Sequence, residues 1–289
     1  MTLQTVAAAE PAIPGRTRSA IAHKALLYGL VAVIALVFFV PFVYTISTSF
    51  KTIPDSVNVT LIPHPWTTAA WRDIWNNYDF KLYFRNSFFL CAVIVACNIF
   101  LGGLGGYAFA RLRFPGRDLL FLVVLATIMV PDQLRLIPIY VLLVNWHLIS
   151  NFSGYILMNL VTATNLFFMR QYFLTIPKDF EEAAKLDGAG HFKTFWRVML
   201  PLALPAIGAL TILQFQGTWN DFFWPLILFQ GRANLYTVQL GLANLRFTYT
   251  TLWPQIAAGS IIAIVPILLV FLALQRFFVS GAVTAGVKG

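Results

Sequence analysis

The chain has 289 residues, of which 59% are hydrophobic and only 11% are charged, and its mean hydropathy is +0.75. This composition excludes an ordinary soluble domain and predicts an integral membrane protein. Helices are the expected spanning elements, because a helix satisfies its backbone hydrogen bonds within one segment. The net charge of +9 raises the question of a nucleic-acid partner, which the placement of the basic residues answers.

Residues 1–24 are polar and predict a cytoplasmic disordered tail. Six apolar segments follow, each close to the roughly 20 residues with which a helix crosses a bilayer. The expected fold is therefore an all-α polytopic membrane protein with six kinked transmembrane helices, which span Leu26–Ser47, Ser87–Ala110, Leu119–Leu143, Tyr155–Phe173, Leu204–Phe229 and Ile256–Phe277. Prolines inside the spans predict kinks, and a run of glycines from 102 to 106 predicts close helix packing.

The basic residues are distributed unevenly between the two sides of the membrane that these spans define. If the N-terminus lies inside, 13 of the 20 lysines and arginines fall on cytoplasmic segments and 7 fall on the opposite side. This bias fits the positive-inside rule with both termini in the cytoplasm. It accounts for the net charge and excludes nucleic acid as an expected partner.

The sequence offers little that would support a metal site, a disulfide or an enzyme. Cys91 and Cys97 lie in the same predicted helix, about 9 Å apart along its axis, which is too far for a disulfide. The four histidines have no ligand spacing, so no metal site is expected. No nucleophile, metal set or pair of acids is grouped inside the predicted spans, and we therefore expect no catalytic residues.

The predicted inner loop from about 174 to 203 has a structure of its own. Asp179, Glu181 and Glu182 place negative charge near the positive end of a short helix. Small alanines follow, and Gly188 and Gly190 are expected to end that helix. A second helix should begin near Phe192, with an apolar face that lies on the membrane domain, formed by Phe192, Phe195, Trp196 and Met199. An ordinary amphipathic connector is the alternative.

The predicted fifth span carries polar residues on one helical face. Gln214, Thr218 and Asp221 are spaced i, i+4 and i+7, and Trp219, Asn220 and Trp224 lie beside them. Polar side chains at this depth face a bundle interior or a cavity, and hydroxyl-binding groups with aromatic faces suit a sugar. A structural polar cluster between spans or at the outer interface is equally expected. Weaker candidates for the path are Asp132, Gln133, Arg135, Asn159 and Asn165, and an Asp132–Arg135 pair could simply neutralise itself.

One segment of the inner loop resembles a family signature. Glu182, Ala183 and Ala184 are followed after three residues by Gly188, and then after nine residues by Val198, Met199, Leu200 and Pro201. This pattern resembles the EAA signature of permease subunits of bacterial ATP-binding-cassette importers, with valine in place of the usual isoleucine. In that family the first helix of the loop is the coupling helix, which seats in a cleft of the ATPase.

Other segments resemble the carbohydrate-uptake branch of that family, which includes maltose and glycerol-phosphate permeases. They are YAFARLRFPGR (107–117), MVPDQLRLIPIY (129–140), WNDFFWPL (219–226) and the tail SGAVTAGVKG (280–289). The resemblance divides the chain into the tail 1–24, a permease domain over 25–279 and a cytoplasmic C-terminal tail over 280–289. That last tail either reaches the ATPase or is a frayed terminus.

The resemblance implies a heterotetramer in the bacterial inner membrane. Its expected partners are a paralogous permease, two ATP-binding subunits, an extracytoplasmic solute-binding protein and membrane lipid. The chain itself would bind no cofactor, since it lacks a P-loop motif, and ATP and Mg would be held by the ATPase. The expected solute is a sugar or polyol, with glycerol-3-phosphate, a glycerophosphodiester or another polar solute as the alternative. An ion-coupled secondary transporter is the rival class, although neither repeats nor buried coupling acids are evident.

The resemblance also implies roles for particular residues. The residues expected at the ATPase contact are Glu181, Glu182, Ala183, Ala184, Asp187, Gly188, Leu200 and Pro201. Glu182 is the residue expected to form an ion pair with the ATPase. By position alone, the outer segment from about 230 to 254 corresponds to a loop that probes the binding protein, here with Asn234, Tyr236, Gln239, Asn244 and Arg246.

Overall fold

A computed structural model describes residues 15–246 and 251–286, and every regular element within these ranges is helical. The longer helices are α1 (Gly15–Thr48), α3 (Phe80–Arg111), α4 (Arg117–Ile128), α5 (Asp132–Asn145), α7 (Ala163–Thr175), α11 (Leu204–Asn220) and α14 (Trp253–Gly286). The shorter ones are η1 (Asp55–Val57), α2 (Ala69–Asn76), α6 (Phe152–Met158), α8 (Asp179–Leu186), α9 (His191–Thr194), the π-helical turn η2 (Phe195–Met199), α10 (Leu200–Leu202), α12 (Phe223–Phe229), η3 (Ala233–Leu235) and α13 (Val238–Asn244).

The described residues contain four helices that are long and apolar enough to cross a membrane, and up to six if two bent pairs each count as one span. The single helices are Ile21–Thr48, Phe80–Arg111, Phe152–Thr175 and Trp253–Phe277. Arg117–Ile128 and Asp132–Asn145 form one bent pair with an angle of 103°, and His191–Leu202 and Leu204–Asn220 form the other with an angle of 76°. The expected all-helical membrane fold is thus confirmed.

Two of the predicted spans are interrupted rather than continuous. The segment predicted as Leu119–Leu143 breaks before α5, where Pro131 has extended ψ and no backbone N–H to donate. The segment predicted as Leu204–Phe229 ends as a helix at Asn220, because Asp221 adopts an extended backbone and its carboxylate accepts a hydrogen bond from the Trp224 amide at 3.3 Å. A separate helix, α12, then begins.

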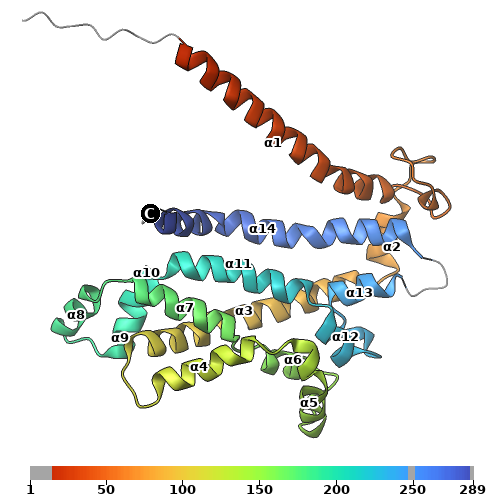
Figure 1. Ribbon diagram of the computed structural model, residues 1–289. Coiled ribbons are helices and arrows are strands. Elements are labelled where there is room, and N and C mark those ends of the chain that lie inside the picture. The colour runs from red at the N-terminus through yellow and green to blue at the C-terminus, as the bar shows by residue number, and fades with distance from the viewer. Residues whose placement is uncertain (1–14, 247–250, 287–289) are drawn as a thin grey trace, which may run out of the picture.

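The two ends of the chain are more helical than the predicted tails. Helix α1 begins at Gly15, inside the segment 1–24, and α14 continues to Gly286, inside the segment 280–289. Residues 1–14 and 287–289 lie outside the described part. Figure 1 shows α1 extending away from the other helices, and its side chains are exposed along most of its length.

Helices α3 and α7 pack closely through glycines, as the run from 102 to 106 predicts. A Cβ atom at Gly106 would lie 2.6 Å from Cβ of Met169 and 2.9 Å from the backbone nitrogen of Arg170. A Cβ at Gly102 would lie 3.4 Å from Cβ of Asn165. Only a residue without a side chain allows this approach at Gly106.

A buried tryptophan of helix α11 bonds α11 to α14. Trp219 is fully buried, its indole stacks on Phe215 with ring centroids 5.5 Å apart, and its Nε1 donates to the Ala263 carbonyl at 3.0 Å. The buried indole therefore keeps its hydrogen bond while it fills the gap between the helices. Figure 1 shows α11 running between α8–α10 at one end of the helices and α12–α13 at the other.

Candidate functional site

A cavity of about 880 Å³ lies where three helices are interrupted. Its lining includes residues from the break between α4 and α5, from the break between α6 and α7, and from the end of α11. Non-helical backbone at membrane depth is tolerated where it lines a cavity, because water or a solute can then satisfy its polar groups. The volume lies in the range of small-molecule sites.

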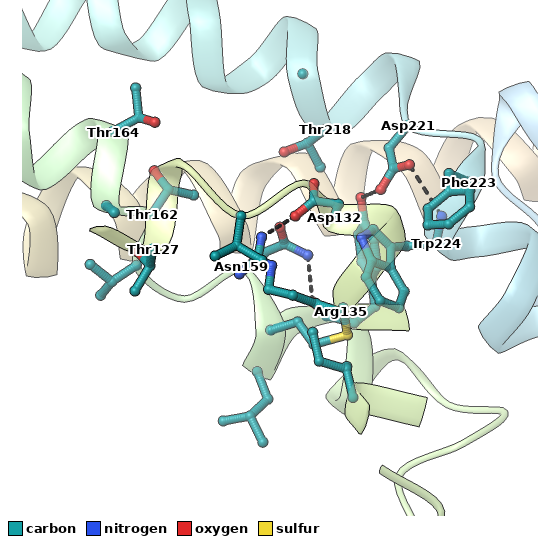
Figure 2. Close-up of a pocket in the computed structure, with 18 of the residues that line it drawn as sticks. Thr127, Asp132, Arg135, Asn159, Thr162, Thr164, Thr218, Asp221, Phe223 and Trp224 are labelled. Atoms are coloured by element: carbon teal, nitrogen blue, oxygen red, sulfur yellow. Dashed lines mark hydrogen bonds and ion pairs between the residues drawn. The ribbon is translucent and has the colours of Figure 1, made fainter. Parts of the chain in front are cut away.

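The polar face predicted on the fifth span does line this cavity. Gln214, Thr218 and Asp221 are all half-buried lining residues, and the Gln214 Nε2 donates to the Thr218 hydroxyl at 3.3 Å. Figure 2 shows Thr218 and Asp221 near Trp224 on the same side of the cavity. The i, i+4, i+7 spacing thus places three hydrogen-bonding groups on one wall.

Two of the three neighbours of that face point elsewhere. Trp219 is directed into the contact with α14, and the exposed Asn220 accepts a hydrogen bond from Gln239 at 3.1 Å, outside the cavity lining. Trp224 does line the cavity. Adjacent residues on a helix are about 100° apart, so the six predicted path residues divide into four that line the cavity and two that do not.

A chain of amide side chains supports the cavity wall from behind. The buried Asn98 of α3 accepts hydrogen bonds at its Oδ1 from the Thr162 amide at 2.8 Å and from Asn165 Nδ2 at 3.1 Å. The same Asn165 nitrogen donates to Gln214 Oε1 at 3.1 Å. This network joins α3, α7 and α11, and buried networks of this kind fix one arrangement of side chains.

Each charged residue that lines the cavity already has an ion-pair or hydrogen-bond partner within the chain. Arg135 forms an ion pair with Asp132, three residues earlier in α5, as its spacing predicts (Figure 2). Asp221 accepts a hydrogen bond from the buried Tyr155 hydroxyl at 2.8 Å and from the Trp224 amide at 3.3 Å. The sequence interpretation missed Asn98, Tyr155 and Thr162. Asn98 could have been identified from the sequence, because it is a polar residue within an apolar span.

The predicted inner loop contains α8, which ends sharply at Gly188. The Ala189 amide donates to the Ala184 carbonyl at 2.9 Å and the Gly188 amide donates to the Lys185 carbonyl at 3.0 Å, which is the Schellman arrangement. Gly188 has φ +75°, as this turn requires. Gly190 has an ordinary φ of −72° and instead precedes α9, so one glycine rather than two ends the first helix.

The predicted coupling residues divide between two faces of α8. Glu182, Ala183, Asp187 and Gly188 are exposed, whereas Glu181 and Ala184 are buried. The following segment is less continuous than predicted, since α9 passes into the π-helical turn η2 and then into α10, which holds the half-buried Leu200 and the exposed Pro201. Phe195 and Met199 are buried as expected, but Phe192 and Trp196 are exposed.

The described part of the predicted binding-protein segment lies at the opposite end of the helices from α8 (Figure 1), and its residues 247–250 lie outside the described part. The carbonyls of Asn234 and Tyr236 accept hydrogen bonds from Asn86 Nδ2 at 2.9 and 3.0 Å, which ties this segment to α3. Gln239 and Arg246 line a second cavity of about 680 Å³, where Arg246 lies over the Trp253 ring. Asn244 is exposed at the end of α13.

Interrupted helices that line a polar cavity are a feature of solute-transporting membrane proteins. Residues 98–282 match the family described as "Binding-protein-dependent transport system inner membrane component". The chain belongs to this family, and it is an inner-membrane permease component of an ATP-binding-cassette transport system.

Relatives with known names agree with this assignment. The chain is 37% identical over 222 residues to the arabinooligosaccharides transport system permease protein AraQ of Bacillus subtilis, with 74% of this chain and 79% of the relative covered. It is 34% identical over 233 residues to the sn-glycerol-3-phosphate transport system permease protein UgpE of Yersinia pestis, with 78% and 83% covered. Both relatives are named as permease proteins of transport systems.

A solved structure shows the same fold. A chain from the crystal structure of a bacterial ABC transporter involved in the import of the acidic polysaccharide alginate matches with a TM-score of 0.75 and 24% identity. The match covers 93% of this chain and 100% of that chain. At this identity the likeness establishes the fold of the chain.

Proposed function

We propose that the chain is one permease subunit of an ATP-driven, binding-protein-dependent importer that moves a sugar or sugar-like solute into the cytoplasm. The observation that carries this proposal is the combination of the polar cavity with the exposed EAA helix at one end of the bundle. The cavity supplies a path, and α8 supplies a surface through which a separate ATPase can act.

The proposed cycle is alternating access. ATP binding closes two ATPase subunits, α8 moves with the subunit on which it is seated, and this chain and a paralogous permease open toward a loaded solute-binding protein. ATP hydrolysis returns them to the inward-facing state. ATP and Mg are held by the ATPase subunits, and this chain contributes Glu182, Ala183 and the Gly188 turn to the contact.

The chemistry of the cavity favours an uncharged polyhydroxylated solute. Among the described residues that line it, Arg135 is the only arginine or lysine, and its charge is balanced by Asp132, while Asp221 adds a carboxylate. The remaining polar groups are amides and hydroxyls, which pair with sugar hydroxyls, and the Trp224 ring offers an aromatic face. The buried Arg135 Nε has no hydrogen-bond partner among the described residues.

Purification of the tagged chain from its native membrane, followed by reconstitution, tests the proposal. We expect ATPase subunits to co-purify, and we expect vanadate-sensitive ATP hydrolysis that the cognate solute-binding protein stimulates. Uptake of solute into vesicles should require ATP. Uptake that is driven by an ion gradient in the isolated chain would contradict the proposal and support a secondary transporter.

A second candidate solute is glycerol-3-phosphate or a glycerophosphodiester. The observation in its favour is the 34% identity to a glycerol-3-phosphate permease. Competition for uptake separates the two candidates: inhibition by neutral oligosaccharides supports the first, and inhibition by glycerol-3-phosphate alone supports the second.

A further inference from the structure

One glutamate of the EAA helix faces inward and meets an arginine at the end of α3. Arg111 Nε lies 2.8 Å from Glu181 Oε1, and the two side chains are only 5% and 11% exposed. Glu182, the next residue along α8, is exposed. Two consecutive acids on one short helix therefore have different surroundings, and only Glu181 is paired within the described part of the chain.

Arg111 also holds the end of a third helix. Its Nη2 donates to the Phe173 carbonyl at 2.6 Å and to the Ile176 carbonyl. Both carbonyls lie at the C-terminal end of α7 (Ala163–Thr175), where a positive charge is favourable because the last carbonyls of a helix lack partners within it. One guanidinium thus joins α3, α7 and α8, and its planar fork is suited to several acceptors at once.

The connection continues from this joint to the wall of the cavity. Arg111 is the last residue of α3, and Asn98 lies thirteen residues earlier in the same unbroken helix, about 20 Å away at the helical rise of 1.5 Å per residue. Asn98 bonds the break between α6 and α7 and, through Asn165, the cavity-lining Gln214. A rigid helix therefore links α8 at one end to the cavity at the other.

We propose that the Arg111–Glu181 ion pair is the joint that passes displacement of the coupling helix to α3 and so to the cavity wall. Arg111 and Glu181 are positioning residues: Glu182, Ala183 and the Gly188 turn contact the ATPase, and Glu181 keeps α8 from sliding over the membrane helices. This inference rests on the proposed function, since it assumes that an ATPase moves α8.

The test uses the complete reconstituted transporter and two spin labels, with Cys91 and Cys97 replaced by serine. The labels are placed at the exposed positions 185 in α8 and 113 after α3. In the native background, we expect one narrow distance distribution that is the same with and without ATP and vanadate, because α8 and α3 move together. Glu181→Gln should broaden the distribution and lower solute uptake per ATP hydrolysed by about tenfold, since it leaves the buried guanidinium without its counter-charge.

Two further variants complete the design. Asp179→Asn removes an exposed carboxylate from the first turn of the same helix. We expect it to leave the distance distribution and the uptake per ATP hydrolysed as in the native transporter. Arg111→Lys keeps the charge balance but not the fork, so we expect a broader distribution and a partial loss of uptake per ATP. If Glu181→Gln does not assemble, Arg111→Lys tests the joint by the same distance distribution and the same uptake per ATP hydrolysed.

The outcomes separate this inference from the proposed function. Native distance distributions and native uptake per ATP in both Glu181→Gln and Arg111→Lys would overturn the joint while the importer assignment stands. Absence of ATP-dependent uptake in the unmutated transporter would instead overturn the proposed function.

Discussion

At the scale of single residues, neighbouring side chains on one helix have different tasks because a helix turns about 100° per residue. Glu181 is buried beside Arg111 and Glu182 is exposed, although the sequence shows two identical acids. The same geometry separates Thr218, which lines the cavity, from Trp219, which is bonded to α14. The periodicity identified the faces, but only the packing determined which face meets which neighbour.

Reversing the charge of the exposed acid tests the ATPase contact. We expect Glu182→Lys to abolish uptake without preventing membrane insertion, because removal of one member of an interfacial charge pair costs about 2 to 5 kcal/mol. The measurement is uptake in vesicles together with the amount of chain in the membrane. Asp118→Lys, an exposed acid after the α3–α4 turn, is the control and should transport normally. Normal uptake by a well-expressed Glu182→Lys variant would remove the coupling role.

The cavity acid offers a second prediction at this scale. Asp221→Asn loses the charge and keeps only one acceptor oxygen, whereas the aspartate uses Oδ2 for the Tyr155 hydroxyl and Oδ1 for the Trp224 amide. Charge-assisted hydrogen bonds are about twice as strong as neutral ones. We therefore expect the solute concentration that gives half-maximal uptake to rise about tenfold. Asp73→Asn, whose side chain accepts from Gln255 outside the cavity, is the control. Equal kinetics in the two variants would show that Asp221 does not bind solute.

At the scale of elements, the distance between α3 and α7 is determined by glycine. Gly106→Leu would place side-chain atoms into Met169 and the Arg170 backbone, and overpacking of this kind typically costs about 1 to 3 kcal/mol. We therefore expect a lower thermal unfolding temperature in detergent. Gly29→Leu in α1 is the matched control, since nothing lies within 4 Å of a Cβ at that position. A native unfolding temperature for Gly106→Leu would contradict this packing.

The turn after α8 provides a second prediction for an element. Gly188 and Gly116 share a left-handed φ, +75° and +76°, and a Cβ at either position would have nothing within 4 Å. Tryptophan at each position therefore meets the same backbone strain, roughly 1 to 2 kcal/mol. We expect Gly188→Trp to abolish uptake by blocking the ATPase contact and Gly116→Trp to retain it. Equal losses in both variants would mean that backbone strain alone is responsible.

At the scale of the whole molecule, the described chain leaves a long apolar helix uncovered. Helix α1 is exposed along most of its length and extends away from the other helices (Figure 1). A membrane or partner subunits must cover such a surface. We expect the chain, extracted in a mild detergent, to form a complex of several times its own mass of 32.4 kDa, as measured by light scattering with correction for detergent. A single-chain mass under conditions that preserve transport would contradict the heterotetramer.

Much of the fold could be predicted from the composition of the chain and the periodicity of its apolar residues. The features that were not predicted have a common cause. The continuous helices α3 and α14 were predicted because an uninterrupted apolar run can form only a helix in lipid. The break at Asp221 was missed because a single aspartate within an apolar span is compatible with a continuous helix. In the structure its carboxylate instead accepts a hydrogen bond from the Trp224 amide in the next helix. Tyr155 was missed because its partner Asp221 is 66 residues away.

The sequence by itself therefore determined the membrane class, the apolar segments, the EAA signature and the hydrogen-bonding face of α11, because these depend on local composition and spacing. The tertiary structure alone decided that three helix breaks meet in one cavity, that Asn98 and Asn165 support its wall, and that Glu181 belongs to Arg111 rather than to the outer surface. The physical reason is that buried polar groups must find partners, and those partners come from distant parts of the chain, where no local pattern records them.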